Sequence, residues 1–270
     1  MERNCMLRML LAVLFLVSCG AKAQEQSFMP ENNLHFYDSF AAANMTEAEF
    51  NQIVADAEAI YAPIIYDLGA QLQIQKDWKN STVNAYASQS GSTWIVKMFG
   101  GMARRPEMTS DGFRLVLCHE LGHHVAGFPY YNGMWAANEG QSDYYSVHAC
   151  FRRMIEKNKD PLGYVEPKVV SNCNYFWKNS VNRYICKRSM MGGVSLANLL
   201  GVLGGTKVSI NTKDTSQVSK TSDSHPAAQC RLDTYVAGSL CKNSWDDKII
   251  PNSVEESGSC PNRPKCWYAP

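Results

Sequence analysis

The sequence His119-Glu120-Leu121-Gly122-His123, a His-Glu-x-x-His motif, constrains this chain more than any other stretch. On an α-helix, side chains four residues apart lie on one face, so both imidazoles can bind the same metal ion while Glu120 lies at the edge of that face. The chain has only six histidines, so a chance match to this spacing is rare. The motif indicates a candidate zinc hydrolase centre, and the fold has to bring further ligands to its helix.

The third ligand has to come from another part of the chain, because a catalytic zinc generally takes three protein ligands and keeps a fourth position for water. A pattern with glycine three and histidine six residues after His123 would supply it, but Ala126 and Pro129 stand there. Glu139 at the start of the next helix is the best candidate. Asp143, one turn later, can accept the outer N–H of a ligand imidazole. The reverse assignment, with Asp143 as the ligand and Glu139 solvated, stays open.

Glu120 is the candidate general base. Zinc lowers the pKa of its bound water towards neutrality, and a carboxylate beside that water can take its proton and pass it to the leaving nitrogen of a peptide. The alternative is a simple carboxylate on a helix surface. His124 lies well round the helix from the metal face, so we expect it to be packed or solvated rather than to bind the metal.

Local signals place the motif on a helix. Residues 109–111 are all possible N-caps, and Gly127 ends the apolar pattern. Phe113, Leu117 and Leu121 recur on the side opposite the two histidines, which leaves one face for the core. A second helix is expected from Asn138 to about residue 158.

The remaining patterns predict an α+β fold. Thr46-x-x-Glu49 is a capping box that opens a helix, which Pro63 interrupts or kinks. Short alternating runs over 72–74, 83–87 and 94–99 predict a small sheet just before the motif helix. Another helix is expected over 227–240. Met190 to Gly205 is apolar and rich in glycine, and a mobile loop, a buried segment and a membrane-interface patch all remain open.

The N-terminus predicts export. Arg3 and Arg8 precede an apolar run that ends at Val17, too short for a comfortable membrane span, so residues 1–19 are expected to be a signal peptide. Leu16-Val17-Ser18-Cys19 resembles a lipobox, which predicts lipidation of Cys19 and a membrane anchor. Cleavage after Ala23 is the alternative. Residues 24–45 are expected to form a tether or loosely packed arm.

The cysteines agree with export. Of ten in the chain, Cys5 and Cys19 precede the expected mature domain, and the other eight suit disulfides in an oxidising compartment. Short spacing suggests the pairs Cys173 with Cys186 and Cys260 with Cys266, so residues 242–270 are expected to be a disulfide-held tail. A cysteine-rich zinc site is the alternative, although paired Cys-x-x-Cys spacing is missing. The net charge of +1 gives no electrostatic argument for nucleic acid.

Several motifs in order resemble the gluzincin metallopeptidases typified by the CAAX prenyl protease, HtpX and BepA. The resemblance covers roughly residues 47–238 and rests on five stretches: Val83-Asn84-Ala85-Tyr86-Ala87, Trp94 to Gly101, His119 to His124, Glu139-Gly140-Gln141-Ser142-Asp143, and Ser224-His225-Pro226 with Arg231 six residues after the histidine. It implies a zincin-like metallopeptidase domain over residues 46–241, in which a small mixed sheet packs on the two ligand-bearing helices.

The resemblance also implies how a substrate binds. The strand Trp94 to Phe99 would be the edge strand beside the cleft, on which an extended peptide pairs through its backbone. It implies substrate-binding positions at Asn84, Ala85, Trp94, Ile95 and Val96.

Two further catalytic residues follow from the same resemblance. His225 or Arg231 would stabilise the tetrahedral oxyanion from the far helix. In BepA-like relatives the histidine that corresponds to His225 can also occupy the open position of the metal and hold the enzyme latent.

We therefore expect a zinc endopeptidase with one zinc ion per chain that acts on protein or peptide substrates at a bacterial cell envelope, in the periplasm or as an outer-membrane lipoprotein. One alternative is a noncatalytic zinc-binding protein, such as a chaperone-like factor or scaffold. Another is a secreted degradative protease.

Overall fold

The computed structural model describes residues 25–37, 45–156 and 160–269, and in them the chain folds into a mixed α+β structure. The described residues form one four-stranded sheet with the strand order β1-β3-β4-β2, where the bounds are β1 Gln26–Ser27, β2 Gln71–Asp77, β3 Ala85–Ser90 and β4 Thr93–Phe99. Strand β4 is antiparallel to β3 and parallel to β2. Cys19 and both predicted processing sites lie outside the described residues.

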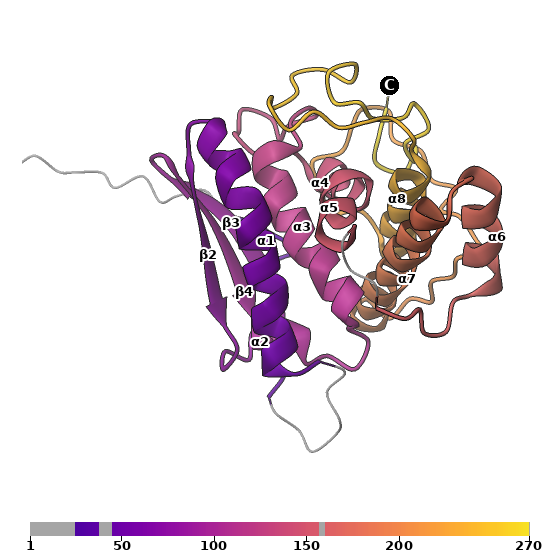
Figure 1. Ribbon diagram of the computed structural model, residues 1–270, viewed down its shortest axis with the longest axis horizontal. Helices are drawn as coiled ribbons and strands as arrows, with labels where there is room; N and C mark the ends of the chain where they lie inside the picture. The colour runs from indigo at the N-terminus through magenta and orange to yellow at the C-terminus, as the bar shows by residue number, and fades with distance from the viewer. Residues whose placement is uncertain (1–24, 38–44, 157–159, 270) are drawn as a thin grey trace, which may run out of the picture.

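Helix α1, Glu47–Asp67, packs beside the sheet (Figure 1). The predicted capping box is present: Thr46 Oγ1 accepts a hydrogen bond from the Glu49 amide, and the Glu49 carboxylate accepts one from the Thr46 amide. Pro63 does not end the helix. Its side chain is exposed. Because proline has no N–H, the carbonyl four residues earlier lacks its helical donor, and on this exposed side water can hydrate it.

The motif lies on α3, Ser110–Val125, which runs through the centre of the molecule with the sheet and α1 on one side and α7 on the other (Figure 1). Of the three possible N-caps, Thr109 is the one whose side chain accepts the first-turn amide. The short helix α2, Gly100–Ala103, follows β4. The helix predicted from Asn138 is present as α4 Glu139–Tyr145, a π-helical turn Ser146–Cys150 and α5 Phe151–Ile155.

The glycine-rich segment after Met190 is helical and buried, so the loop and membrane-interface interpretations are wrong. It belongs to α7, Ser180–Leu203, which packs between α3 and α8, Ala228–Leu240, while α6, Pro167–Phe176, packs on its outer side. A Cβ at Gly192 would lie 3.0 Å from the Asp111 carbonyl, and one at Gly193 would lie 2.7 Å from Tyr235 Cβ. Close packing against two helices thus outweighs the low helix propensity of glycine.

Eight cysteines form four disulfides: Cys118–Cys150, Cys173–Cys186, Cys230–Cys266 and Cys241–Cys260. The pairing of Cys173 with Cys186 is confirmed. The predicted pairing of Cys260 with Cys266 is wrong, because the tail folds back over α8 and each of these cysteines meets a partner at one end of that helix. The tail is held by disulfides, as expected.

The predicted loose arm is instead packed into the protein at its start. Strand β1 pairs with β3, and Phe28 is fully buried in the main core. The predicted edge position of the strand Trp94 to Phe99 is also wrong, because β4 is paired on both sides. The alternating pattern of a strand reveals its two faces but not its neighbours. The pairing of β4 with β2 and that of β3 with β1 both depend on residues outside the strand itself.

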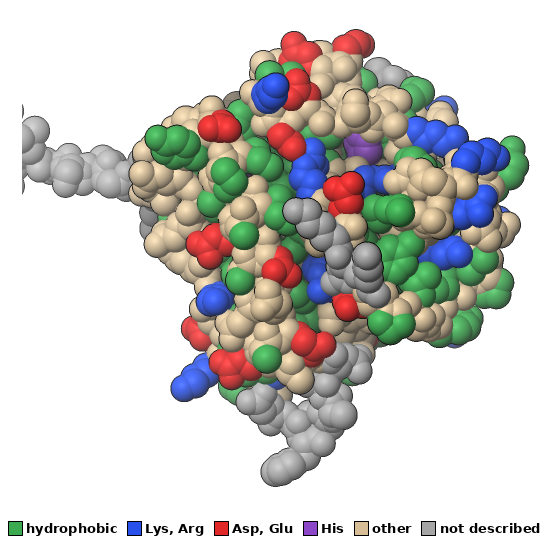
Figure 2. Space-filling model, viewed as in Figure 1, with side chains coloured by type: hydrophobic (Ala, Val, Ile, Leu, Met, Phe, Trp, Pro, Cys, Tyr) green, Lys and Arg blue, Asp and Glu red, His purple; other side chains and the backbone are tan. Residues whose placement is uncertain are grey.

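On the face in Figure 2, basic side chains gather over the side of the molecule where α6 lies, and several acidic ones lie over α1. Among the described residues, no helix has the length and apolar character that a membrane span requires.

Candidate metal centre

Two helices bring together a group that can hold a metal ion. His119 and His123 from α3 and Glu139 from α4 place their ligand atoms within 4.8 Å of one another, and all three residues are fully buried. His119 Nε2 lies 3.3 Å from Glu139 Oε2, and His123 Nε2 lies 3.5 Å from Glu139 Oε1. His119 Nε2, His123 Nε2 and Glu139 Oε2 have no hydrogen-bond partner. Buried polar atoms of this kind are costly unless something binds them, so the residues fit a metal ion.

Both imidazoles have their second nitrogen fixed by an acceptor. His123 Nδ1 donates to the Ala137 carbonyl at 2.8 Å, and His119 Nδ1 donates to Asp143 Oδ1 at 2.8 Å. Because Nδ1 donates a hydrogen bond in each ring, Nε2 is the nitrogen left to bind a metal ion in the shared space. Glu139 is the carboxylate beside both rings, and Asp143 lies behind His119. The arrangement agrees with the first of the two assignments that the sequence left open.

Asp143 joins the metal ligands to α8. Its carboxylate accepts hydrogen bonds from Arg231 Nε at 2.7 Å and Nη2 at 2.6 Å, and from the Tyr235 hydroxyl at 2.8 Å. Arg231 is only 1% exposed. Its charge offsets the burial of Asp143, so the pKa of the Asp143 carboxyl stays below its usual range. A buried charge paired in this way keeps its position, and it fixes the orientation of His119.

Glu120 is fully buried on α3, and both of its carboxyl oxygens have no hydrogen-bond partner. Burial raises the pKa of Glu120 well above its ordinary value. A carboxyl of this kind can exchange a proton with a group beside it.

The ligand imidazoles differ in charge. Burial lowers the pKa of His123 to about 4, so its ring is neutral. Burial also opposes the charged form of His119, but the Asp143 carboxylate outweighs it and raises the pKa of His119 to about 9. A metal needs the neutral ring, so binding at His119 releases a proton.

The close approach of the two helices depends on small residues. A Cβ at Gly122 would lie 3.1 Å from the Ser142 Cα, and the Cys118–Cys150 disulfide ties α3 to the π-helical turn after α4. A larger residue at position 122 would therefore push α3 and α4 apart.

Two tyrosines in the centre were not predicted. The Tyr131 hydroxyl donates to Glu139 Oε1 at 2.6 Å, and Tyr235 holds Asp143. Tyr131 lies in the aromatic loop that precedes α4. Tyr235 lies four residues after Arg231, and this helical spacing was the only signal that could have revealed it.

The side chains assigned by resemblance lie around the N-terminal segment. His225 Nε2 lies 2.8 Å from the Ser27 carbonyl oxygen and 3.5 Å from Glu139 Oε2. Arg231 Nη1 donates to the Phe28 carbonyl. Asn84 binds the backbone of Met29, and the Ala85 carbonyl accepts the Phe28 amide.

The three positions on β4 lie apart from this group, and two of them, Trp94 and Ile95, contact His124. That ring stacks between Trp94 and Trp135, with ring centroids 5.3 and 4.8 Å away, and its Nε2 lies 3.2 Å from the Ile95 carbonyl. Val96 is buried in the core. His124 is therefore packed, which is one of the two outcomes, packed or solvated, expected from the sequence.

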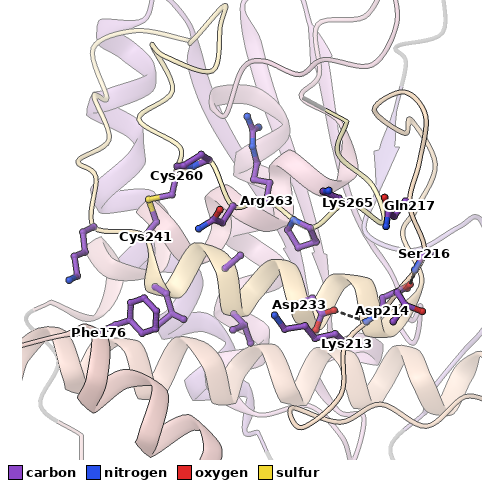
Figure 3. A pocket seen from close by; sticks show the side chains of 18 residues that line it. Phe176, Lys213, Asp214, Ser216, Gln217, Asp233, Cys241, Cys260, Arg263 and Lys265 are labelled. Carbon is purple, nitrogen blue, oxygen red and sulfur yellow. Dashed lines mark hydrogen bonds between the residues drawn. A yellow bond between two sulfur atoms is a disulfide. The ribbon is translucent and has the colours of Figure 1, made fainter.

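The alternative cysteine-rich zinc site has no free thiol among the described residues, because all eight of their cysteines form disulfides. Asp214 lies close to Cys230 and Cys266, but these two cysteines form a disulfide. A separate pocket lies between α8 and the tail (Figure 3). Asp233 and Asp214 meet there through a backbone hydrogen bond, and none of the candidate metal ligands lines it.

Comparisons with protein-family models, curated proteins and solved structures found no match to this chain. The argument for its function therefore rests on the residues of this centre.

Proposed function

We propose that this protein is a zinc-dependent endopeptidase in which His119, His123 and Glu139 bind one zinc ion per chain. The observation that supports it best is the convergence of three buried, unpartnered ligand atoms beside the unpartnered carboxyl of Glu120. Two imidazoles and one carboxylate are a common ligand set of catalytic zinc, which keeps a further position open.

The chemistry follows from the groups in the centre. A zinc ion supplies Lewis acidity and lowers the pKa of a bound water towards neutrality. Glu120 takes the proton of the attacking water and passes it to the leaving nitrogen of the peptide bond. Burial raises the pKa of Glu120, which favours uptake of the proton by this carboxyl.

His225 and Arg231 act on the peptide backbone in this proposal. His225 Nε2 lies 3.5 Å from Glu139 Oε2, and from there it stabilises the oxyanion that forms from the attacked carbonyl. Arg231, held by Asp143, binds the next carbonyl and positions the peptide. Latency through binding of His225 to the metal has no support in its contacts, because its Nε2 donates to the Ser27 carbonyl.

We also propose the gluzincin resemblance and the zincin-like fold as the framework for this centre, with α3 and α4 as the two ligand-bearing helices. Substrate pairing is assigned to the edge of β3 that the two-residue strand β1 covers, because Ala85 on β3 lies beside the centre and both neighbours of β4 are long strands of the sheet.

Export to a bacterial cell envelope is the proposed setting, with misfolded or envelope proteins as substrates. Four disulfides support an oxidising compartment. Mass analysis of the mature N-terminus tests the anchor: a lipidated Cys19 supports it, and an unmodified N-terminus at Gln24 supports the other processing site.

The direct test of function is hydrolysis of an unfolded protein, such as a reduced and alkylated substrate, by the zinc-loaded chain. We expect cleavage within the substrate, loss of cleavage when a chelator removes zinc, and recovery when zinc is restored. Cleavage that persists without zinc contradicts the proposal.

A further inference from the structure

The residues Gln26–Met29 lie against β3 as an added antiparallel strand. Gln26 pairs with Ala87 and Ser27 with Tyr86, and the Phe28 amide donates to the Ala85 carbonyl at 3.1 Å. This strand comes from a segment more than fifty residues before β3 in the chain. Addition of a strand to a sheet edge is a general way in which proteins bind extended peptides.

Three consecutive carbonyls of this strand each meet a different side chain of the centre. The Ser27 carbonyl accepts from His225 Nε2 at 2.8 Å, the Phe28 carbonyl accepts from Arg231 Nη1 at 2.6 Å, and the Met29 carbonyl accepts from an amide hydrogen of Asn84 at 3.2 Å. Asn84 Oδ1 also accepts the Met29 amide at 3.0 Å. Contacts of this kind read the backbone of a peptide rather than its side chains.

One side chain of the strand fills a closed pocket. The Phe28 ring is 0% exposed and meets the edge of the His119 ring, with centroids 5.2 Å apart. The Arg231 guanidinium carbon lies 4.2 Å from the centre of the Phe28 ring. The Ser27 carbonyl lies beside His225, which in turn is 3.5 Å from Glu139 Oε2. The peptide bond between Ser27 and Phe28 is therefore connected to Glu139 through one side chain, His225.

We propose that Gln26–Met29 occupies the substrate cleft in the way that a peptide substrate does, so that the protein blocks its own active site. The inference rests on the proposed function and deepens it. The substrates are extended peptide segments with a large apolar or aromatic residue on the C-terminal side of the attacked bond, in the Phe28 pocket. Because the strand belongs to the same chain, it competes with substrate at an effective concentration of about a millimolar.

The test measures peptide binding by the full chain without zinc. The probe is a fluorescent peptide with the sequence of residues 25–31, and its anisotropy is followed with wild type and with Phe28→Ala. We expect Phe28→Ala to bind the probe at least about tenfold more tightly than wild type, because the segment Gln26–Met29 of the variant, without the Phe28 ring, competes poorly with the probe. A probe with alanine in place of its phenylalanine should lose at least about tenfold in affinity for the same variant.

The matched control is Phe50→Ala, which removes an equally buried phenylalanine from the core beneath α1. It should bind the probe no better than wild type. Equal binding by folded Phe28→Ala and wild type, or an equal gain in Phe50→Ala, overturns the inference. If circular dichroism shows that Phe28→Ala does not fold, Gln26→Pro replaces it, because proline removes the amide opposite Ala87 without a change in the core.

Zinc-free binding separates this inference from the proposed function. A gain in probe binding by Phe28→Ala supports the self-blocked cleft even if the zinc-loaded protein hydrolyses nothing, a result that removes the peptidase proposal. Hydrolysis by wild type with no gain in binding overturns the self-blocked cleft alone.

Discussion

Asp143 accepts a hydrogen bond from His119 Nδ1 at 2.8 Å, and through this contact a metal ligand on α3 is joined to Arg231 on α8. The same carboxylate therefore orients the ring of a candidate metal ligand and holds the guanidinium that donates to the Phe28 carbonyl. The metal group and the cleft are connected by one buried side chain.

Asp143→Asn should weaken zinc binding by about 10- to 100-fold, because an amide is a poorer acceptor for His119 Nδ1 and leaves the Arg231 charge without its partner. The zinc affinity is measured by competition with a chromogenic chelator. Asp233→Asn, on the same helix as Arg231, is the matched control and should keep the wild-type affinity. Asp233 accepts hydrogen bonds from the Asp214 amide and the Gln229 side chain, away from the centre. Equal affinities in the two variants would show that Asp143 does not support the ligand.

Glu139→Gln should abolish stoichiometric zinc binding, because the amide offers no charge to a site whose other ligands are two neutral imidazoles. Metal content after dialysis is the measurement. Glu107→Gln, which changes a carboxylate paired with Arg105 away from the centre, should retain one zinc per chain. Zinc retained by Glu139→Gln would favour Asp143 as the ligand.

Replacement of the Cys118–Cys150 pair by alanines should lower the free energy of unfolding by about 3–4 kcal/mol, because this disulfide closes a long loop in the unfolded chain. The Cys173–Cys186 pair closes a shorter loop, and its loss should cost about 3 kcal/mol. Urea unfolding of both double variants checks the order. A smaller loss for the first pair would argue against an effect that grows with loop length.

His148 should make the protein less stable in mild acid. Burial lowers its pKa to about 4, and its Nε2 donates to the Asn243 carbonyl while Nδ1 is buried without a partner. Between the unfolded value of about 6.5 and pH 4 the unfolded chain binds a proton that the folded chain does not, so stability falls as the pH falls. One proton contributes about 1.4 kcal/mol for each pH unit in this window.

The measurement for His148 is the free energy of unfolding at pH 7, 5.5 and 4.5. His148→Gln keeps a donor for Asn243 but does not titrate, so its stability should depend less steeply on pH than that of wild type. Parallel curves for the two proteins would assign the acid sensitivity to other groups.

Local signals predicted much of this molecule, because a capping residue and its helix are neighbours in the chain. Thr46 and Thr109 both cap as their patterns indicate, and the spacing of His119 and His123 placed them on one helix face. Glu139 was found by chemistry, since an open zinc site needs a third ligand.

Features that depend on distant contacts were missed. The pairing of Cys260 depends on how the tail crosses α8, and the helical state of Gly193 depends on the space left by Tyr235. Phe28 lies in a polar stretch whose periodicity gave no reason to expect burial. The Phe28 ring lies beside His119. The carbonyls of Ser27, Phe28 and Met29 that hold this segment accept hydrogen bonds from side chains far away in sequence.

Hydrolysis of an unfolded protein by zinc-loaded protein with and without Glu120 tests the central claim most directly. Wild type and Glu120→Gln are compared at equal zinc content, each also with Phe28→Ala to open the cleft. We predict equal zinc binding and a rate about 100-fold or more lower in both Glu120→Gln proteins. Fully zinc-loaded protein that cleaves nothing in any of the four forms, or cleaves equally well without the Glu120 carboxylate, would contradict the account.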